Sequence, residues 1–297
     1  MSTVRLPIEV SEGSSTEPVA VGLVGAGPWA RATYVPMLSS SPHTRLCGVW
    51  TRRPEAASDL GVPVFRRLAD LFDACEAVAF CVPPEVQPEL AIQAVEAGKA
   101  VLLEKPLAAD LTSARLLVDA IVTTGVASQM ALTMRYALST RVFLQRAHEI
   151  EAFGGHAFNV SGGLLREESP DSWRSRRGAL LDIGPHLIDV LDAALGRVTA
   201  VQAHGDPRLW TGLLLDHEGG RVSELSLSRA VGGQSRHWSF SVFGAKGSAK
   251  LDKLDGDVFG VLSAEFADTV RRGGGHPLDA AHGLRLQEIT IAAEEQL

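Results

Sequence analysis

Cysteine is scarce in this sequence, with three residues among 297, and none of them forms the C-x-x-C spacing of redox and zinc-binding motifs. Cys47 and Cys81 fall in apolar segments that look like strands. The nine histidines include no H-x-x-x-H or H-E-x-x-H pair. We therefore expect buried free thiols in a reducing compartment, no disulfide framework and no metal site.

The sequence also lacks a basic segment and a long apolar segment. Its formal net charge is -7, and its lysines and arginines form no block. Nucleic acids and anionic membranes both require a concentrated basic surface, so neither is expected as a partner. No apolar run is long enough to span a bilayer, and the first residues do not have the charged-then-apolar pattern of a signal peptide. We expect a cytoplasmic protein that acts on a small-molecule substrate.

The pattern along the chain predicts three parts. Residues 1–18 are mostly polar and are expected to form a flexible arm. Residues 19–134 alternate apolar strands with helices, which predicts right-handed crossovers and a doubly wound parallel sheet. The expected strands are residues 19–24, 45–50, 77–82, 100–104 and 127–132. The expected helices are residues 30–38, 68–75, 86–97 and one that begins after Asp110 and ends before Gly125.

Residues 135–297 follow a different pattern. After an expected helix at residues 140–151, apolar and polar residues alternate at 156–160, 222–227, 239–243 and 248–251. This alternation indicates a sheet with one face in water, and helices near 262–272 and 277–295 end the chain. The fold class is therefore α/β: an N-terminal Rossmann domain, and a C-terminal α+β domain with an open, largely antiparallel sheet.

A glycine-rich turn follows the first predicted strand and precedes a helix, as a dinucleotide site requires. Gly25 permits the tight turn, Gly27 lets the backbone approach a pyrophosphate, and Ala30 keeps the helix close to the strand. The helix N-terminus adds N–H donors and a partial positive charge. The turn therefore predicts dinucleotide binding.

The end of the second predicted strand indicates which dinucleotide binds. Sites that prefer NAD usually carry Asp or Glu there, to bind the ribose 2'-hydroxyl. This chain has Thr51, Arg52 and Arg53 instead. A hydroxyl and guanidinium groups suit a 2'-phosphate, so NADP is expected and NAD remains an alternative. One of the two arginines is also compatible with an ordinary surface position.

Two short motifs carry candidate chemistry. The triplet Glu104-Lys105-Pro106 follows the strand at 100–103, so its lysine is expected at the nicotinamide end of the cleft. A cis bond before Pro106 is compatible with this position. Asp182 and His186 are four residues apart, so they share one face of a helix. Taken singly, Lys105 in a surface ion pair and His186 in the core would be ordinary structural residues.

Together, these motifs resemble the Gfo/Idh/MocA family, named for glucose–fructose oxidoreductase and inositol dehydrogenase. The resemblance runs from Val19 nearly to the end of the chain. It includes the glycine turn, the apolar strand that ends at Pro83-Pro84, the Glu-Lys-Pro triplet and the D-x-G-x-H segment 182–186. It implies hydride transfer between a nicotinamide and a carbon that bears a hydroxyl or carbonyl group, often on a sugar, nucleotide-sugar or cyclitol.

The resemblance also assigns roles to residues. In inositol-dehydrogenase-like members, the lysine of the triplet and the Asp and His of the second motif are catalytic, which implies Lys105, Asp182 and His186 here. His186 would give a proton to the substrate oxygen or take one from it, Asp182 would orient the imidazole, and Lys105 would hydrogen-bond the oxygen. The implied cofactor-binding residues are Gly25, Gly27, Pro28, Trp29, Ala30, Thr51, Arg52, Arg53, Pro83, Pro84, Glu104 and Lys105.

Substrate contacts are less well defined by the sequence. Tyr136, Trp173 and Arg174 are candidates, and four arginines within residues 166–177 suit an anionic substrate or, equally, a solvated loop with Glu167, Glu168 and Asp171 as partners. The chain is shorter than the usual family member, so some loops of the substrate domain are expected to be missing. The family further implies a homo-oligomer formed through the C-terminal sheet. Alternative functions are an imine or other keto reductase on the same fold and a non-catalytic NADP-sensing regulator.

Overall fold

The computed structural model describes residues 17–166, 173–233 and 235–297, so residues 1–16 of the expected arm lie outside it. The described chain divides into two compact units. The first comprises the chain up to Ala131 and the segment Phe259–Leu284, and the second comprises Leu132–Val258 and Arg285–Leu297. The prediction had placed all of residues 135–297 in one domain, whereas a C-terminal segment returns to the first unit.

The first unit contains the predicted parallel sheet. Its six strands lie in the order β3-β2-β1-β4-β5-β6, and every neighbouring pair is parallel. This is the strand order of a doubly wound dinucleotide-binding fold, which confirms the predicted fold class. The strands are β1 (Val19–Val24), β2 (Thr44–Trp50), β3 (Val64–Phe65), β4 (Ala77–Phe80), β5 (Ala100–Leu103) and β6 (Ser128–Met130).

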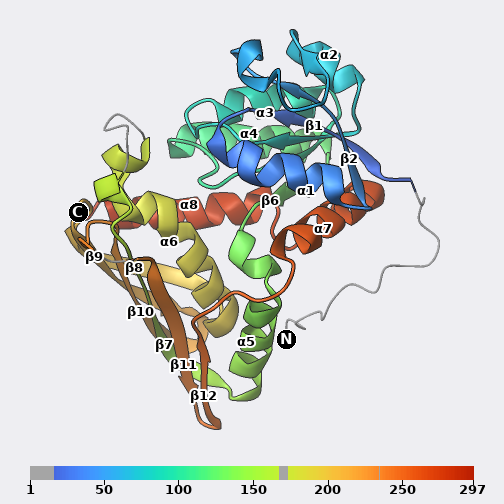
Figure 1. Ribbon diagram of the computed structural model, residues 1–297. Helices are drawn as coiled ribbons and strands as arrows, with labels where there is room; N and C mark the ends of the chain where they lie inside the picture. Colours follow the sequence, from blue (N-terminus) through green and yellow to red (C-terminus); the bar gives the residue numbers. More distant parts are fainter. Residues whose placement is uncertain (1–16, 167–172, 234) are drawn as a thin grey trace. The chain divides into compact units, whose positions relative to one another are not determined.

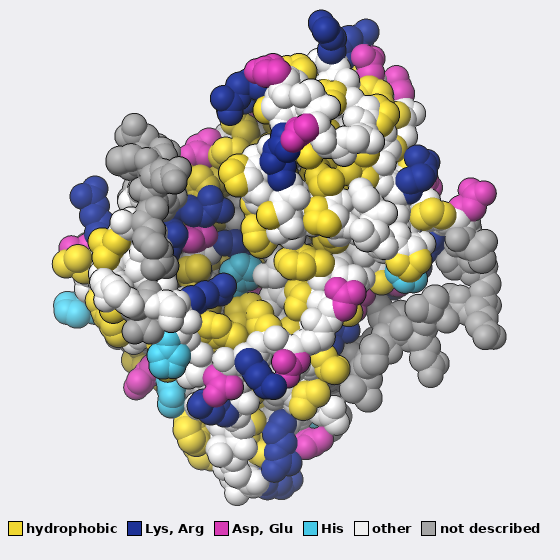
Figure 2. Space-filling view, in the orientation of Figure 1, with side chains coloured by type: hydrophobic (Ala, Val, Ile, Leu, Met, Phe, Trp, Pro, Cys, Tyr) yellow, Lys and Arg dark blue, Asp and Glu magenta, His cyan; other side chains and the backbone are white. Residues whose placement is uncertain are grey.

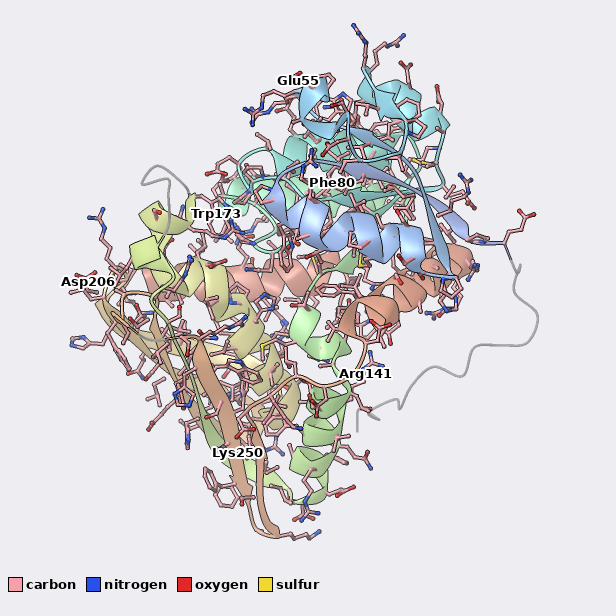
Figure 3. All side chains as sticks on the ribbon, in the orientation of Figure 1. Glu55, Phe80, Arg141, Trp173, Asp206 and Lys250 are labelled. Atoms are coloured by element: carbon pink, nitrogen blue, oxygen red, sulfur yellow. The ribbon has the colours of Figure 1, made fainter. Side chains whose placement is uncertain are left out.

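Burial explains why these strands are apolar throughout. Every residue of β1, β4 and β5 is buried, as expected for central strands of a sheet that helices cover on both faces (Figure 1). Phe80, labelled in Figure 3, is fully buried in β4. The helices of this unit are α1 (Val35–Ser40), α2 (Leu68–Asp73), α3 (Gln87–Glu96), α4 (Leu111–Thr124) and α7 (Val258–Arg272), together with the first part of α8 (Ala280–Glu294).

Helix α4 begins and ends as the sequence predicts. The Asp110 carboxylate accepts a hydrogen bond from the backbone N–H of Ser113 at 2.8 Å, which caps the N-terminus. Gly125 ends the helix in the left-handed conformation, with φ of 71°. Before α1, by contrast, the turn η1 (Ala30–Tyr34) is π-helical, so the helix after the glycine turn is locally wider than an α-helix.

The second unit contains the predicted open sheet. Its strands lie in the order β12-β11-β7-β10-β9-β8, with β7 and β10 parallel and all other pairs antiparallel. The bounds are β7 (Ala152–Val160), β8 (Val198–Asp206), β9 (Trp210–His217), β10 (Arg221–Ser228), β11 (His237–Gly244) and β12 (Gly247–Leu251). The largely antiparallel sheet is confirmed, although the sequence analysis did not identify β8 and β9.

Two helices of this unit are α5 (Leu138–Glu149) and α6 (Trp173–Leu195). Helix α6 packs against β7 and β10, and its backbone is interrupted at Gly178, which has φ of 69°. A Cβ atom at this position would lie 2.1 Å from the carbonyl oxygen of Pro207, so only glycine fits. None of the helices in the described ranges has the length and apolarity needed to cross a membrane.

Candidate functional site

The glycine turn after β1 has a geometry that only glycine supports at its first position. Gly25 has φ of 114°, and its backbone N–H donates to the carbonyl oxygen of Trp50 at 2.9 Å. A Cβ atom here would lie 2.2 Å from the carbonyl oxygen of Cys81. The close approach of the turns after β1 and β4 therefore requires glycine at position 25.

Gly27 and Ala30 meet the other two requirements of a dinucleotide turn. A Cβ atom built on Gly27 would meet nothing within 4 Å, so the backbone there faces open space. Ala30 is fully buried between the helix and the sheet. The first helical hydrogen bond runs from the N–H of Arg31 to the carbonyl oxygen of Gly27 at 3.0 Å. The backbone N–H groups that precede Arg31 point out of the helix N-terminus, so the turn fits a pyrophosphate group.

A pocket of about 230 Å³ lies against this turn, wholly within the first unit. Its wall brings together residues predicted from three separate segments, including the turn, the end of β2 and the end of β4. Arg52 and Arg53 are the charged residues among them. The lining residues are Gly25, Ala26, Gly27, Trp50, Thr51, Arg52, Arg53, Cys81, Val82, Pro83, Val86 and Leu90.

No carboxylate is among the residues of the described chain that line the pocket, so the charged side chains in its wall are the positive Arg52 and Arg53. Arg52 and Arg53 are both exposed, and the hydroxyl of Thr51 accepts a hydrogen bond from the N–H of Arg53 at 3.4 Å. Sequence reasoning did not single out the apolar lining residues Val86 and Leu90. Their place at the start of α3, shortly after β4, is a signal that could have found them.

Trp29 and Glu104, both predicted to contact the cofactor, contact each other. The indole Nε1 of Trp29 donates to Oε1 of Glu104 at 2.8 Å, and the Tyr34 hydroxyl donates to the same oxygen at 2.8 Å. The backbone of Glu104 is held by the side chain of Gln87, which donates to its carbonyl oxygen at 2.9 Å and accepts from its N–H at 3.0 Å. This network fixes the helix after the glycine turn to the carboxyl end of β5.

Lys105 is the second residue after β5 and is half-buried. Its N–H donates to Oε2 of Glu104 at 3.3 Å, and the peptide bond to Pro106 is cis. The remaining predicted cofactor residues, Pro28, Ala30 and Pro84, lie close to the pocket in the sequence but are not among its lining residues. The structure therefore places Lys105 at the carboxyl end of the sheet, where such folds bind their ligands.

Asp182 and His186 both lie on α6, in the second unit. They are 7% and 9% exposed and are one helical turn apart, as their spacing predicts. Pro185 lies between them within the helix. Two further aspartates on α6 are buried and paired with arginines: Asp189 with Arg135 at 2.7 Å, and Asp192 with Arg285 at 2.6 Å.

Asp182 forms ion pairs with arginines from two separate segments. Nε of Arg174 lies 3.3 Å from Oδ1 of Asp182, and an Nη atom of Arg229 lies 3.0 Å from Oδ2. Burial lowers the pKa of Arg236, and the charge of Asp182 acts against this shift. Arg229 and Arg236 were not predicted, because nothing in the local sequence connects them with Asp182.

The other substrate candidates differ in exposure. Tyr136 is 1% exposed and belongs to the largest fully buried side chains. Trp173, at the start of α6 in Figure 3, is 9% exposed, and the guanidinium carbon of Arg174 lies 4.5 Å from the centre of a Trp173 ring. Glu167, Glu168 and Asp171, the alternative partners for these arginines, lie outside the described residues.

Figure 2 shows how charged side chains are distributed over one face of the molecule. On the face shown there, dark blue lysine and arginine side chains are interspersed with magenta aspartate and glutamate side chains, and no large area has one sign of charge.

The thiols of Cys47 and Cys75 interact, and this contact together with burial raises the pKa of Cys75. Cys75 is buried, Cys47 and Cys81 are partly buried, and the described part of the chain contains no disulfide between them.

Sequence comparisons identify both parts of the chain. A family described as an oxidoreductase family with an NAD-binding Rossmann fold matches residues 19–132, and the GFO/IDH/MocA C-terminal domain matches residues 147–250. The chain is 33% identical over 213 residues to Dehydrogenase FPY6 of Fusarium mangiferae, covering 61% of this chain and 59% of that protein. It is 29% identical over 186 residues to Glucose-6-phosphate 3-dehydrogenase of Bacillus subtilis, covering 58% and 52% of the two chains. The matches thus span a little over half the length of these relatives.

Solved structures agree on the fold. GenD2 from gentamicin A biosynthesis, in complex with NAD, has a TM-score of 0.82 at 22% identity, covering 97% of this chain and 96% of that one. Levoglucosan dehydrogenase, in complex with NADH and levoglucosan, has a TM-score of 0.80 at 19% identity, covering 94% and 97%. With both domain matches covering most of the sequence, the chain belongs to the GFO/IDH/MocA oxidoreductase family.

Proposed function

We propose that this protein is an NADP-dependent oxidoreductase that transfers a hydride between the nicotinamide and a hydroxyl or carbonyl carbon of a sugar, nucleotide-sugar or cyclitol. The observation that carries the proposal is the Asp182–His186 pair, nearly buried on one face of α6 in a chain that also has a dinucleotide turn. The names of relatives, among them Galactose 1-dehydrogenase and Levoglucosan dehydrogenase, support a sugar-like substrate.

The choice of NADP rests on the pocket at the end of β2. Arg52 and Arg53 line it beside Thr51. Guanidinium groups bind phosphate by charge-assisted, bidentate hydrogen bonds, whereas the carboxylate of an NAD site would repel a 2'-phosphate. We therefore propose a preference for NADP over NAD.

Each catalytic role follows from the chemistry of the side chain. The bound nicotinamide supplies or accepts the hydride. When the substrate is a ketone, negative charge develops on its oxygen, and His186 donates a proton there. In the oxidation direction His186 accepts that proton. Asp182 orients the imidazole, and Lys105 donates a hydrogen bond that stabilises the developing charge.

Substitution at these positions tests the proposal. We expect Lys105→Ala and His186→Ala each to lower kcat at least about 100-fold, the range that general acid–base groups contribute, with little change in the NADPH dissociation constant. A panel of sugars and cyclitols with NADP would identify the substrate, and Arg146→Gln, at an exposed arginine in the last turn of α5, provides the control. Wild-type turnover in both alanine variants would refute the assigned roles.

We also propose that the protein forms a homo-oligomer through the second sheet. On one face of this sheet the partly exposed apolar residues Val222 and Phe243 flank the same residue, Gly154, of β7. His156 lies on this face as well, with its ring centre 5.9 Å from that of Phe243. Size-exclusion chromatography with light scattering would test the proposal. We expect Phe243→Asp to reduce the assembly, and an unchanged mass would count against this interface.

A further inference from the structure

Arg31 lies in η1, five residues after Ala26 of the glycine turn, and its guanidinium contacts two segments at once. Its Nε donates to the carbonyl oxygen of Ala26 at 3.2 Å. Its Nη1 and Nη2 atoms donate to the two carboxylate oxygens of Asp59 at 2.9 and 2.8 Å, and Nη2 also donates to the carbonyl oxygen of Ala56. The side chain therefore connects the glycine turn with the loop after β2, residues 51–59.

The loop after β2 carries the positive residues of the dinucleotide pocket. Arg52 and Arg53 line the pocket. The short helical turn η2 (Pro54–Ala57) starts directly after them, with a hydrogen bond from the N–H of Ala56 to the carbonyl oxygen of Arg53 at 2.9 Å. Ala56 thus bonds to Arg53 through its N–H and to Arg31 through its carbonyl oxygen. The position of Arg53 therefore depends on the guanidinium of Arg31.

Side-chain burial holds little of this loop in place. Ala57 is fully buried, whereas residues 52–55, 58 and 59 are exposed. Exposed segments with few buried contacts open readily, so hydrogen bonds to the rest of the unit determine how well such a loop is ordered. A single exposed ion pair contributes little to stability, but the Arg31–Asp59 pair is bidentate and two bonds to backbone carbonyl groups accompany it.

The guanidinium of Arg31 is committed to the protein. A guanidinium has five N–H donors, and Arg31 uses four of them in the hydrogen bonds to Ala26, Ala56 and Asp59. The Asp59 carboxylate also balances its charge at close range. These contacts suit Arg31 to hold other groups in position, whereas Arg52 and Arg53 line the pocket themselves.

We infer that Arg31 is a positioning residue for the cofactor, which holds the loop after β2 so that Arg52 and Arg53 are already in place for a ribose 2'-phosphate. The inference rests on the proposed preference for NADP and deepens it. Ordering a loop and its arginine side chains on binding costs conformational entropy. A loop fixed in advance lowers this cost for NADPH, whereas NADH lacks the phosphate that the two arginines would bind.

Fluorescence titration of the full chain with NADPH and with NADH tests the inference. In Arg31→Gln we expect the ratio of the two dissociation constants to lose at least about fivefold of the preference for NADPH, because the loop must then be ordered on binding. Arg31→Lys keeps the charge but lacks the planar fork, so it should recover only part of the preference. Full wild-type preference in Arg31→Gln would overturn the inference.

Asp59→Asn separates positioning from charge, because the two effects have opposite signs. The substitution removes a negative charge, so a purely electrostatic effect would tighten binding of the anionic NADPH. Loss of the bidentate pair should instead weaken NADPH binding at least about threefold, with NADH binding within about twofold of wild type. Asp70→Asn, at an exposed aspartate that pairs with Arg67, changes the net charge equally and is the control, with NADPH binding unchanged. Unchanged or tighter NADPH binding by Asp59→Asn would overturn the inference.

Hydrogen–deuterium exchange of the nucleotide-free protein measures the order of the loop directly. Peptides that contain residues 53–59 should exchange faster in Arg31→Gln and Asp59→Asn than in wild type, while unchanged exchange in β1 and β4 would establish that both variants are folded. Equal exchange of the loop in all three proteins would overturn the inference and leave the NADP preference standing. Wild-type protein that binds NADH as tightly as NADPH would contradict the proposed cofactor, and the inference with it.

Discussion

The indole N–H of Trp29 donates to the carboxylate of Glu104 at 2.8 Å, joining two residues that are 75 positions apart. Trp29 lies in the helix after the glycine turn, and Glu104 follows β5. The Tyr34 hydroxyl donates to the same carboxylate oxygen, also at 2.8 Å. One acidic side chain therefore connects the helix after the glycine turn with the segment that carries Lys105.

Removing the Tyr34 donor and removing the Trp29 donor should lower the free energy of unfolding of the first unit by different amounts. Hydrogen bonds to charged groups contribute about 1.5–3 kcal/mol, and Tyr34 is almost fully buried, so Tyr34→Phe should lower the free energy of unfolding by about this amount. Trp29 is 46% exposed, so Trp29→Phe should cost less. Because both donors share one oxygen, the double variant should deviate from additivity by at least about 0.5 kcal/mol. Urea unfolding of the four proteins would measure this, and strict additivity would contradict the shared network.

The two glycines of the turn should respond differently to alanine. At Gly25 the new Cβ would lie 2.2 Å from the Cys81 carbonyl oxygen, at a φ that alanine rarely adopts. Gly25→Ala should therefore lower the melting temperature and abolish dinucleotide binding. At Gly27 the same atom meets open space, so Gly27→Ala should retain wild-type stability but weaken NADPH binding, because the methyl group occupies the space of the pyrophosphate. Scanning calorimetry and a nucleotide titration would separate the two effects, and wild-type binding by Gly27→Ala would mean that the pyrophosphate lies elsewhere.

The arginines of the pocket should determine the nucleotide preference. We expect NADPH to bind at least tenfold more tightly than NADH, and Arg52→Ser or Arg53→Ser to weaken NADPH binding by about 1.5–3 kcal/mol while NADH binding changes little. Fluorescence titration at two salt concentrations would measure both, since a charge-based preference declines with ionic strength. Tighter binding of NADH by the wild-type protein would contradict the preference.

The strands of the fold were predictable where they are fully buried, because burial on both faces requires a continuous run of apolar residues. The fully buried strands β1, β4 and β5 are continuous apolar runs, and Asp110 and Gly125 determine the ends of α4. The pair β8 and β9 was missed because β8 lies at the sheet edge, where most of its residues are exposed and its alternation is weak. The return of α7 to the first unit depends on contacts between distant segments, such as the hydrogen bond from the Thr269 hydroxyl to the Gln129 side chain. Local sequence patterns do not predict contacts of this kind.

The same distinction holds for the candidate site. The glycine turn and the Asp182–His186 spacing are local, so the sequence predicts their geometry. The surroundings of Asp182 are not local, because Arg229 belongs to a loop that reaches Asp182 only through the tertiary arrangement of the strands. The sequence thus indicated candidate groups for the chemistry, whereas the charges around them required the tertiary structure.

His217 should make the stability of the second unit depend on pH. It is 3% exposed, with Nδ1 2.6 Å from the carbonyl oxygen of Gly196 and Nε2 2.8 Å from the hydroxyl of Ser223. A carbonyl oxygen only accepts, so Nδ1 carries the proton and Nε2 accepts from Ser223. Protonation of Nε2 would break this arrangement, and burial lowers the pKa of His217 even though Asp192 and the Gly196 carbonyl act in the opposite direction.

The direction of the pH effect follows from this lowered pKa. Between the folded-state pKa and the ordinary value near 6.5, the unfolded chain binds more protons at His217 than the folded chain does. The contribution is complete above about pH 6.5 and is lost as the pH falls below it. Urea unfolding from pH 8 to pH 5 should therefore show a decline that is smaller in His217→Gln, although this variant is less stable at pH 8. His204→Gln, at an exposed histidine in the same unit, should follow the wild-type curve. If His217→Gln has the same slope as wild type below pH 6.5, His217 does not bind the proton that unfolding takes up.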